Sequence, residues 1–135
     1  MIVADTNLLA YMLIEGEMTF IAREVWEKDH SWCLPTLWRS EFLNVLSLMV
    51  AKDMIPMDHA LVTWGRAVEV VGSSEVVPDG EAILGSAVQF GITAYDAHFM
   101  VAAQSLGVPL VSSDKELIRR CKGIALSPRE FLHAC

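Results

Sequence analysis

The stretch MIVADTN, residues 1–7, decides how the rest of the sequence is interpreted. Residues 1–4 are an unbroken apolar run, which is typical of a strand buried on both faces of a parallel sheet. Asp5 follows this run directly, and Thr6 and Asn7 continue the polar segment. Open parallel sheets bind their ligands beyond the carboxyl ends of the strands. Asp5 is therefore a candidate functional residue, although it could simply cap the helix that follows.

Strand and helix signals alternate along the remaining sequence. Short apolar runs predict strands at 31–35, 75–78, 108–113 and 124–126. Helical periodicity and helix-ending glycines predict helices at 7–16, 18–29, 36–53, 57–71, 79–91, 93–107 and 114–123. This alternation favours the α/β class, with a mainly parallel central sheet and helices on both faces. The length of 135 residues, without repeats or linker-like composition, predicts a single domain over 1–135.

Composition excludes several classes of protein. The sequence is 53% hydrophobic and 20% charged, so it can bury a core and is not of a disordered or fibrous type. Polar residues interrupt every long apolar stretch, so we expect no membrane span and no secretory signal peptide. The cysteines at 33, 121 and 135 form neither a zinc pattern nor a disulfide framework. Together these features predict a cytoplasmic protein.

The net charge limits what the protein can bind. Ten Lys and Arg against seventeen Asp and Glu give a net charge of -7, which disfavours general binding to nucleic acid. Carboxylates can nevertheless hold divalent cations that then face a phosphate group. The charged run DKELIRRCK, residues 114–122, is typical of a solvated helix face, but it could supply cations to a substrate backbone.

Two further acids fall on apolar helix faces. At ~100° per residue, Glu41 lies roughly 200° from Arg39, in the stripe that also carries Val45. A lone buried carboxylate must be paired, protonated or bound to metal, and Glu41 could simply be hydrogen-bonded in the core. Asp96 shares a stripe with Phe99, although the spacing from Thr93 also fits a helix cap. Both acids are candidates for the same site as Asp5.

Asp114 follows the strand predicted at 108–113 and completes the acidic set. Its alternative role is structural, because Ser113 and Glu116 have capping-box spacing around it. Convergence of Asp5, Glu41, Asp96 and Asp114 would suit Mg²⁺ or Mn²⁺, which prefer carboxylate oxygen. His98 lies roughly 200° from Asp96 on its helix, so we expect it to point away from the acids.

Four segments carry a resemblance to a known family. They are MIVADTN (1–7), LPTLWRSEFLNVL (34–46), TAYDAHFMVAA (93–103) and PLVSSDKEL (109–117), in this order. Together they resemble PIN-domain proteins, and most of all the VapC-type ribonuclease toxins of toxin–antitoxin pairs. The resemblance implies a three-layer α/β/α domain that cleaves RNA with Mg²⁺ or Mn²⁺.

The resemblance also implies roles for individual residues and partners. The catalytic and metal-binding residues would be Asp5, Glu41, Asp96 and Asp114. Thr6, Asn44 and Ser112 would support them, with Ser112 in the place where the family often has Thr. No other cofactor is implied. The implied partners are an RNA substrate, a small antitoxin protein and a second copy of the chain in a homodimer.

Alternative functions are compatible with the sequence. A PIN-like module could bind RNA or protein with little catalytic activity, although the intact acidic set argues against this. A phosphotransfer domain with Asp5 or Asp114 as acceptor is disfavoured because ADTN (residues 4–7) offers one acid where such domains have a pair. A DNA-directed nuclease of the same architecture remains a third possibility. The segment 54–80 carries no motif that identifies a target.

Overall fold

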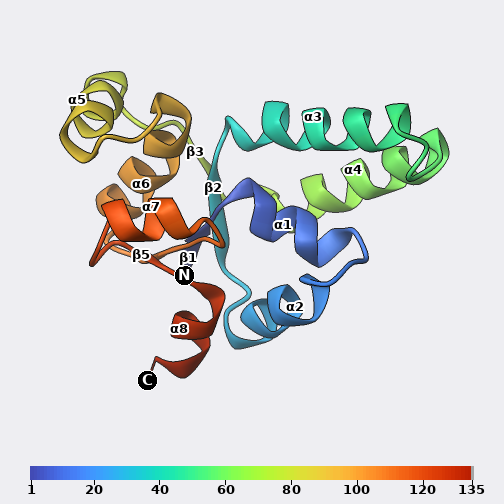
Figure 1. Cartoon of the computed structure of the whole chain (residues 1–135), viewed down its shortest axis with the longest axis horizontal. Coiled ribbons are helices and arrows are strands. Elements are labelled where there is room, and N and C mark those ends of the chain that lie inside the picture. Colours follow the sequence, from blue (N-terminus) through green and yellow to red (C-terminus); the bar gives the residue numbers. More distant parts are fainter. Residues whose placement is uncertain (135) are drawn as a thin grey trace.

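The computed structural model describes residues 1–134 and contains one five-stranded sheet (Figure 1). Cys135, one of the three cysteines expected to be unpaired, lies outside the described residues. The strands are β1 (Ile2–Ala4), β2 (Trp32–Pro35), β3 (Glu75–Val76), β4 (Leu110–Val111) and β5 (Ala125–Leu126). The helices are α1 (Thr6–Leu13), α2 (Thr19–Lys28), α3 (Trp38–Ala51), α4 (Met57–Val71), α5 (Gly80–Phe90), α6 (Ala94–Leu106), α7 (Lys115–Arg120) and α8 (Pro128–His133).

The strand order places β1 at the centre of the sheet. The order is β3-β2-β1-β4-β5, and every paired strand runs parallel to its neighbour. The chain passes from β1 outward to β2 and β3, and it then returns to add β4 on the other side of β1. The boundary between β1 and β4 is therefore the topological switch point, where open parallel sheets form their binding crevice.

Helices cover both faces of this sheet, which confirms the predicted three-layer α/β/α architecture. In Figure 1 the central strands run between α5 and α6 on one side and α1, α3 and α4 on the other. Helix α6 contacts β1, β2 and β4, while α4 contacts β2 from the hairpin that it forms with α3. All three residues of β1 are completely buried, as the apolar run at the N-terminus predicts.

Helix α3 is anchored where it leaves the sheet. The Glu75 carboxylate in β3 accepts hydrogen bonds from the Trp38 indole N–H at 2.8 Å and from Arg39 Nε and Nη2 at 2.8 and 2.7 Å. The indole of Trp38 is buried and also packs against Phe42 and Trp64. These contacts fix the first turn of α3, which carries Glu41.

Several predicted boundaries differ from the structure. The helix predicted over 7–16 ends at Leu13, because the buried Thr19 hydroxyl bonds the Tyr11 and Ile14 carbonyls and draws the chain into a turn. The strands predicted at 75–78 and 108–113 are each reduced to two residues. Helix α8 was not predicted at all.

Other expectations from composition can be checked on the described residues. Cys33 and Cys121 are buried free thiols, in agreement with the absence of a disulfide framework among the described residues. Within residues 1–134, no helix combines the length and apolar character that a bilayer crossing requires. A cytoplasmic location stays a prediction.

Candidate acidic site at the carboxyl edge of the sheet

A cavity of about 240 Å³ opens at the carboxyl edge of the central strands. Four acids from four separate segments line it: Asp5 after β1, Glu41 in α3, Asp96 in α6 and Asp114 before α7. The structure therefore brings together all four acids that the sequence singled out. The remaining lining residues are Thr6, Asn7, Asn44, Val45, Phe99 and Leu117.

Asp5 lies deepest of the four and is held from two sides. Asp5 is 8% exposed, and its Oδ1 accepts a hydrogen bond from the Leu8 backbone N–H at 2.8 Å. Oδ2 accepts one from the Ser112 hydroxyl at 2.6 Å. Asp5 is thus the N-cap of α1, as its alternative role required, and it also lines the cavity. A carboxylate has about four acceptor positions, so two remain beyond these bonds.

Ser112 connects two of the acids. This residue is completely buried just after β4, and its hydroxyl both donates to Asp5 and accepts the Asp114 backbone N–H at 3.0 Å. The Ser112 hydroxyl therefore links the Asp5 carboxylate to the backbone of Asp114. Ser112 stands where the resembling family often has Thr, and both of these contacts use only the hydroxyl group that Ser and Thr share.

Glu41 is held by the residue that follows Asp5. The buried Thr6 hydroxyl donates to Glu41 Oε1 at 2.7 Å, which joins the start of α1 to the first turn of α3. Asn44 lies one helical turn after Glu41 and also lines the cavity. All three residues predicted to have supporting roles, including Ser112, thus lie in the cavity wall or contact an acid in it.

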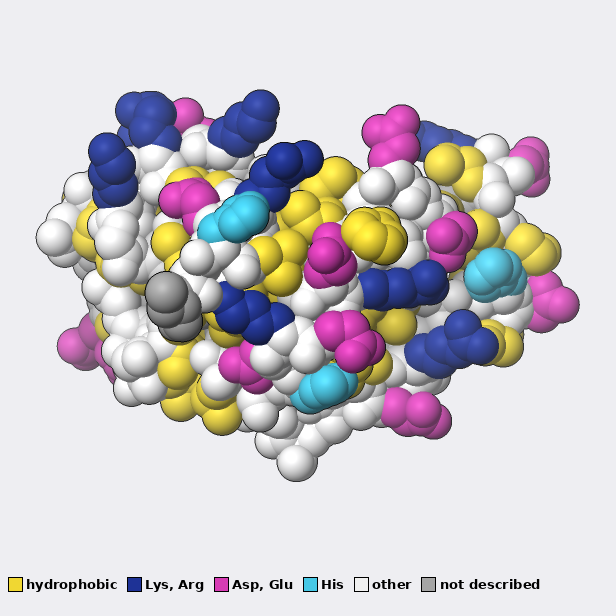
Figure 2. Space-filling model, turned by 90° about the horizontal axis from the view of Figure 1, so that it is seen from below, with side chains coloured by type: hydrophobic (Ala, Val, Ile, Leu, Met, Phe, Trp, Pro, Cys, Tyr) yellow, Lys and Arg dark blue, Asp and Glu magenta, His cyan; other side chains and the backbone are white. Residues whose placement is uncertain are grey.

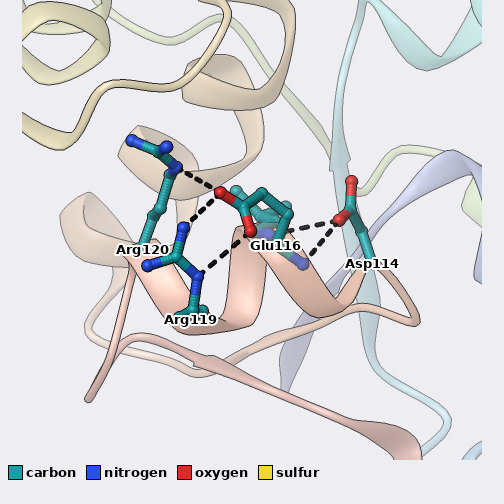
Figure 3. Close-up of polar contacts among 5 residues, drawn as sticks. Asp114, Glu116, Arg119 and Arg120 are labelled. Atoms are coloured by element: carbon teal, nitrogen blue, oxygen red, sulfur yellow. Dashed lines mark hydrogen bonds and ion pairs between the residues drawn. The ribbon is translucent and has the colours of Figure 1, made fainter.

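The caps around Asp96 and Asp114 differ in detail from the expected ones. Thr93 caps α6 by accepting the Asp96 backbone N–H at 3.0 Å, so the Asp96 side chain is not itself the cap. The expected capping box beginning at Ser113 is wrong, because Asp114 is the N-cap of α7. Its Oδ1 accepts the backbone N–H groups of Glu116 and Leu117 at 3.0 and 3.1 Å (Figure 3).

Burial and mutual repulsion govern the charge state of the acids. Burial raises the pKa of Asp5 to about 6; hydrogen bonds from Ser112 and Leu8 oppose this rise, and the charges of Asp114 and Glu41 add to it. Burial likewise raises the pKa of Glu41, opposed by the bond from Thr6 and reinforced by Asp96. The pKa of Asp96 is raised by burial and then by Asp114. The four carboxylates therefore form one electrostatically coupled group.

The chemistry of this donor set suits a hard divalent cation. Carboxylate oxygens are the ligands that Mg²⁺ and Mn²⁺ prefer, and Mg²⁺ keeps several waters of its own. In their present rotamers, however, no three His, Cys, Asp or Glu side chains among residues 1–134 are arranged to hold a metal ion. The cavity thus offers the right ligand type without a closed coordination sphere.

Two nearby residues were not identified correctly from the sequence. Asn7 lines the cavity but received no role, although it belongs to the MIVADTN segment. His98 is absent from the described cavity wall, yet it is close enough to Glu41 for its charge to lower the pKa of that carboxyl. The expectation that His98 points away from the acids is therefore incomplete, because Glu41 of α3 lies within reach of its charge.

We predict that Asp5→Asn stabilises the protein at neutral pH in the absence of metal. Asn can keep the Leu8 cap and a hydrogen bond with Ser112 while it removes a charge from the cavity. The folded-state pKa of about 6 exceeds the unfolded value of 3.8, so the wild-type protein loses stability as the pH rises through this window. The loss amounts to about 3 kcal/mol above pH 6. Urea unfolding in EDTA from pH 4 to 8 measures the difference.

Asp79→Asn is the matched control for this experiment. Asp79 is an exposed N-cap that accepts the Ala82 backbone N–H at 3.0 Å, so it shares the capping role of Asp5 without its burial. The stability difference between Asp5→Asn and wild type should vanish near pH 4, and Asp79→Asn should show no gain at any pH. Parallel curves for the two variants would contradict the charge-based explanation.

Comparison with known proteins identifies the family. Residues 2–123 match the model of the PIN domain family. A curated relative named Exonuclease VapC9, from Pyrobaculum aerophilum, is 39% identical over 68 residues. This alignment covers 46% of the chain and 51% of the relative, so the chain spans about half the length of the curated relative it matches.

A solved structure supports the fold over almost the whole chain. The crystal structure of PAE2754 from Pyrobaculum aerophilum superimposes with a TM-score of 0.77 and covers 97% of this chain and 92% of that one. Its sequence identity of 20% makes this a likeness of fold alone. The sheet order, the acidic cavity and the family match over residues 2–123 lead to one conclusion: the chain belongs to the PIN-domain family.

Proposed function

We propose that this protein is a Mg²⁺- or Mn²⁺-dependent endoribonuclease and the toxin of a toxin–antitoxin pair. The observation that carries the proposal is the gathering of Asp5, Glu41, Asp96 and Asp114 in one cavity at the switch point of the sheet. Membership of the PIN-domain family and the likeness to a protein named VapC9 support it.

In the proposed site, four acids would bind the metal and two hydroxyl groups would orient them. Asp5, Glu41, Asp96 and Asp114 would hold the metal, and the bound cation would activate a water and stabilise the charge that develops on the phosphate. Ser112 and Thr6 keep the Asp5 and Glu41 carboxylates oriented, and their hydrogen bonds favour the charged form by lowering the pKa of each. Asn7 and Asn44 offer neutral polar groups at the cavity wall, where they could contact substrate without adding charge.

Metal-dependent cleavage of single-stranded RNA is the first prediction of this proposal. Asp5→Asn and Asp96→Asn should each lower the cleavage rate by at least ~10²-fold, because each removes a charged group from a preorganised site. Asp79→Asn, an exposed cap outside the cavity, should retain wild-type activity. Undiminished cleavage in EDTA would rule out the proposed chemistry.

Substrate form distinguishes the proposal from its alternatives. Parallel digestion of single-stranded RNA, duplex RNA and DNA separates a ribonuclease from a DNA-directed enzyme. A circular single-stranded RNA has no ends, so its cleavage requires an endonuclease, whereas the relative VapC9 is named an exonuclease. Binding of RNA without metal-dependent cleavage would instead favour a PIN-like binding module.

Metal binding should also raise the melting temperature of the protein. A ligand that binds the folded state alone at ten times its Kd stabilises it by about 1.4 kcal/mol. For a domain of this size, the melting temperature would rise by roughly 3–5 °C. Mg²⁺ should produce this shift, and release protons, in the wild type and in Asp79→Asn, but much less in Asp5→Asn. A matched concentration of NaCl controls for general screening of charge. Equal shifts in all three proteins would mean that the acids do not form one metal site.

We further propose that the chain acts as a homodimer that uses α5. This helix is apolar over most of its length, yet Ile83 is its one buried residue. Leu84 and Val88 are one turn apart and are 68% and 77% exposed, and Tyr95 at the start of α6 is 64% exposed. An exposed apolar face of this kind is typical of a protein interface.

Sedimentation equilibrium at micromolar concentration tests this assembly. The wild type should have twice the 14.9 kDa mass of one chain, whereas the double variant Leu84→Glu/Val88→Glu should have the mass of one chain because charge is introduced into the interface. Leu61→Glu/Val62→Glu introduces the same charge on exposed residues of α4 and should remain dimeric. A wild type with the mass of one chain would contradict the proposal.

The toxin assignment requires a small protein that blocks the acidic cavity. The reading frame beside the one that encodes this chain is expected to specify such an antitoxin, with a DNA-binding N-terminal part. Purification of the two products together, with loss of RNA cleavage in the complex, is the measurement that checks it. A neighbouring product that leaves cleavage unchanged would contradict the assignment.

A further inference from the structure

The segment that follows Asp114 holds the densest group of cations in the chain. Lys115, Arg119, Arg120 and Lys122 are four of the ten Lys and Arg residues, and all four are exposed. With Glu116 as the acid among them, residues 115–122 carry a net charge of +3 in a protein whose total is -7. Figure 2 shows Lys and Arg side chains gathered at the upper left, on the half of the molecule that carries α7 in Figure 1.

Glu116 holds two of these cations together. Its carboxylate accepts hydrogen bonds from Arg119 Nε at 3.1 Å and from Arg120 Nε at 2.7 Å, and Arg119 Nη2 makes a further ion pair with Oε1 (Figure 3). Two guanidinium groups share one carboxylate, so a net positive charge remains. Because all these groups are exposed to solvent, the pairing itself adds little to stability. Its effect is to fix where the two arginines lie.

Arg120 also reaches the turn between α5 and α6. Gly91 has a φ of +65°, and a Cβ built on it would lie 2.5 Å from Arg120 Nη1, so the guanidinium lies directly over this glycine. Helix α6 begins three residues later and carries Asp96, while α7 begins directly after Asp114. Arg120 therefore spans the two elements that bring Asp96 and Asp114 to the cavity. Leu117, which precedes Arg120 by three residues in α7, forms part of the cavity wall.

We propose that the basic group Lys115, Arg119, Arg120 and Lys122, here called the α7 basic patch, binds the phosphate backbone of single-stranded RNA beside the acidic cavity. This inference rests on the proposed ribonuclease function and names the surface that receives the substrate. A cavity lined by four carboxylates repels a polyanion, so the flanking nucleotides need a nearby source of positive charge. At 1.5 Å per residue, Arg120 is about 9 Å along the helix from Asp114, so the patch lies within reach of nucleotides that flank a phosphate in the cavity.

A pair of charge-matched double variants tests the patch. Arg119→Gln/Arg120→Gln removes two charges from it, and Lys52→Gln/Arg66→Gln removes two exposed charges from the α3–α4 hairpin. Each double variant changes the net charge from -7 to -9, so a general effect of protein charge would be equal in both. Steady-state cleavage of a short single-stranded RNA in Mg²⁺ is measured for both and for the wild type over a range of salt concentrations.

The α7 double variant should raise KM by about tenfold at low salt with kcat nearly unchanged, because the groups that perform cleavage stay in place. Each lost phosphate contact should also reduce the slope of log affinity against log salt by about 0.7. The hairpin variant should behave like the wild type. The Mg²⁺-induced melting shift should be the same in all three proteins, which shows that the acidic site is intact.

The possible failures are distinguishable. A wild type that neither binds nor cleaves RNA overturns both the ribonuclease function and the patch. A wild type that cleaves RNA, with equal KM and salt slope in the two double variants, overturns the patch alone. A fall in kcat without a change in KM would also overturn it, since that result would indicate a role in positioning Asp114 instead of substrate binding.

Discussion

The Ser112 hydroxyl is the contact on which the acidic site depends. It is completely buried, donates to Asp5 and accepts from the Asp114 backbone. This bridge can form only because β4 lies beside β1 in parallel register, with Val3 opposite Leu110 and Ala4 opposite Val111. The strand order therefore also determines the geometry of the site. A sheet in which β1 and β4 were not neighbours would separate two acids that are more than 100 residues apart in sequence.

The same arrangement carries an energetic cost in the absence of a cation. Burial is the largest cause that raises the pKa of Asp5, Glu41 and Asp96, and the neighbouring carboxylates raise each further. The hydroxyls of Ser112 and Thr6 reduce this cost without removing it. Functional sites commonly retain such unfavourable charge, because the ligand that relieves it is then bound more tightly. The side chains of Val45, Phe99 and Leu117 in the cavity wall are apolar and offer the carboxylates no compensating hydrogen bond.

Within residues 1–134, the Lys and Arg side chains lie outside the described cavity wall. Arg119 and Arg120 are ordered by Glu116 on the surface of α7, and Arg39 is paired with Glu75 on the opposite side of the site. In an acidic protein this separation lets the cavity keep its attraction for cations while an adjacent surface remains able to contact phosphate. The two properties would cancel if the arginines reached the carboxylates directly.

Much of the central fold could be predicted because the signals for its strands and helices are local in sequence. The apolar run of residues 2–4 predicts a buried strand and places Asp5 at its carboxyl end, and the repeated strand–helix alternation predicts the parallel sheet. Elements set by distant contacts could not be predicted in the same way. Thr19 ends α1 earlier than Gly16 suggested, and Glu75 anchors α3 from 36 residues away. Helix α8 did have a local signal, since Ser127 and Glu130 form a capping box around Pro128, but its six residues are too few for a periodic pattern.

Residue spacing cannot establish that acids from four segments converge, and helix capping and metal binding do not exclude one another for a carboxylate. Asp114 caps α7 through Oδ1 alone, so among the described residues Oδ2 keeps its acceptor positions. Thr93 is the cap of α6 and accepts the Asp96 backbone N–H, and a side-chain hydrogen bond with Thr93 lowers the pKa of the Asp96 carboxyl. Asp5 caps α1 with one oxygen and bonds Ser112 with the other, and each oxygen still has a second lone pair. Capping thus fixes the backbone of each acid at the cavity edge while acceptor capacity remains, so a residue that caps a helix can also be a ligand.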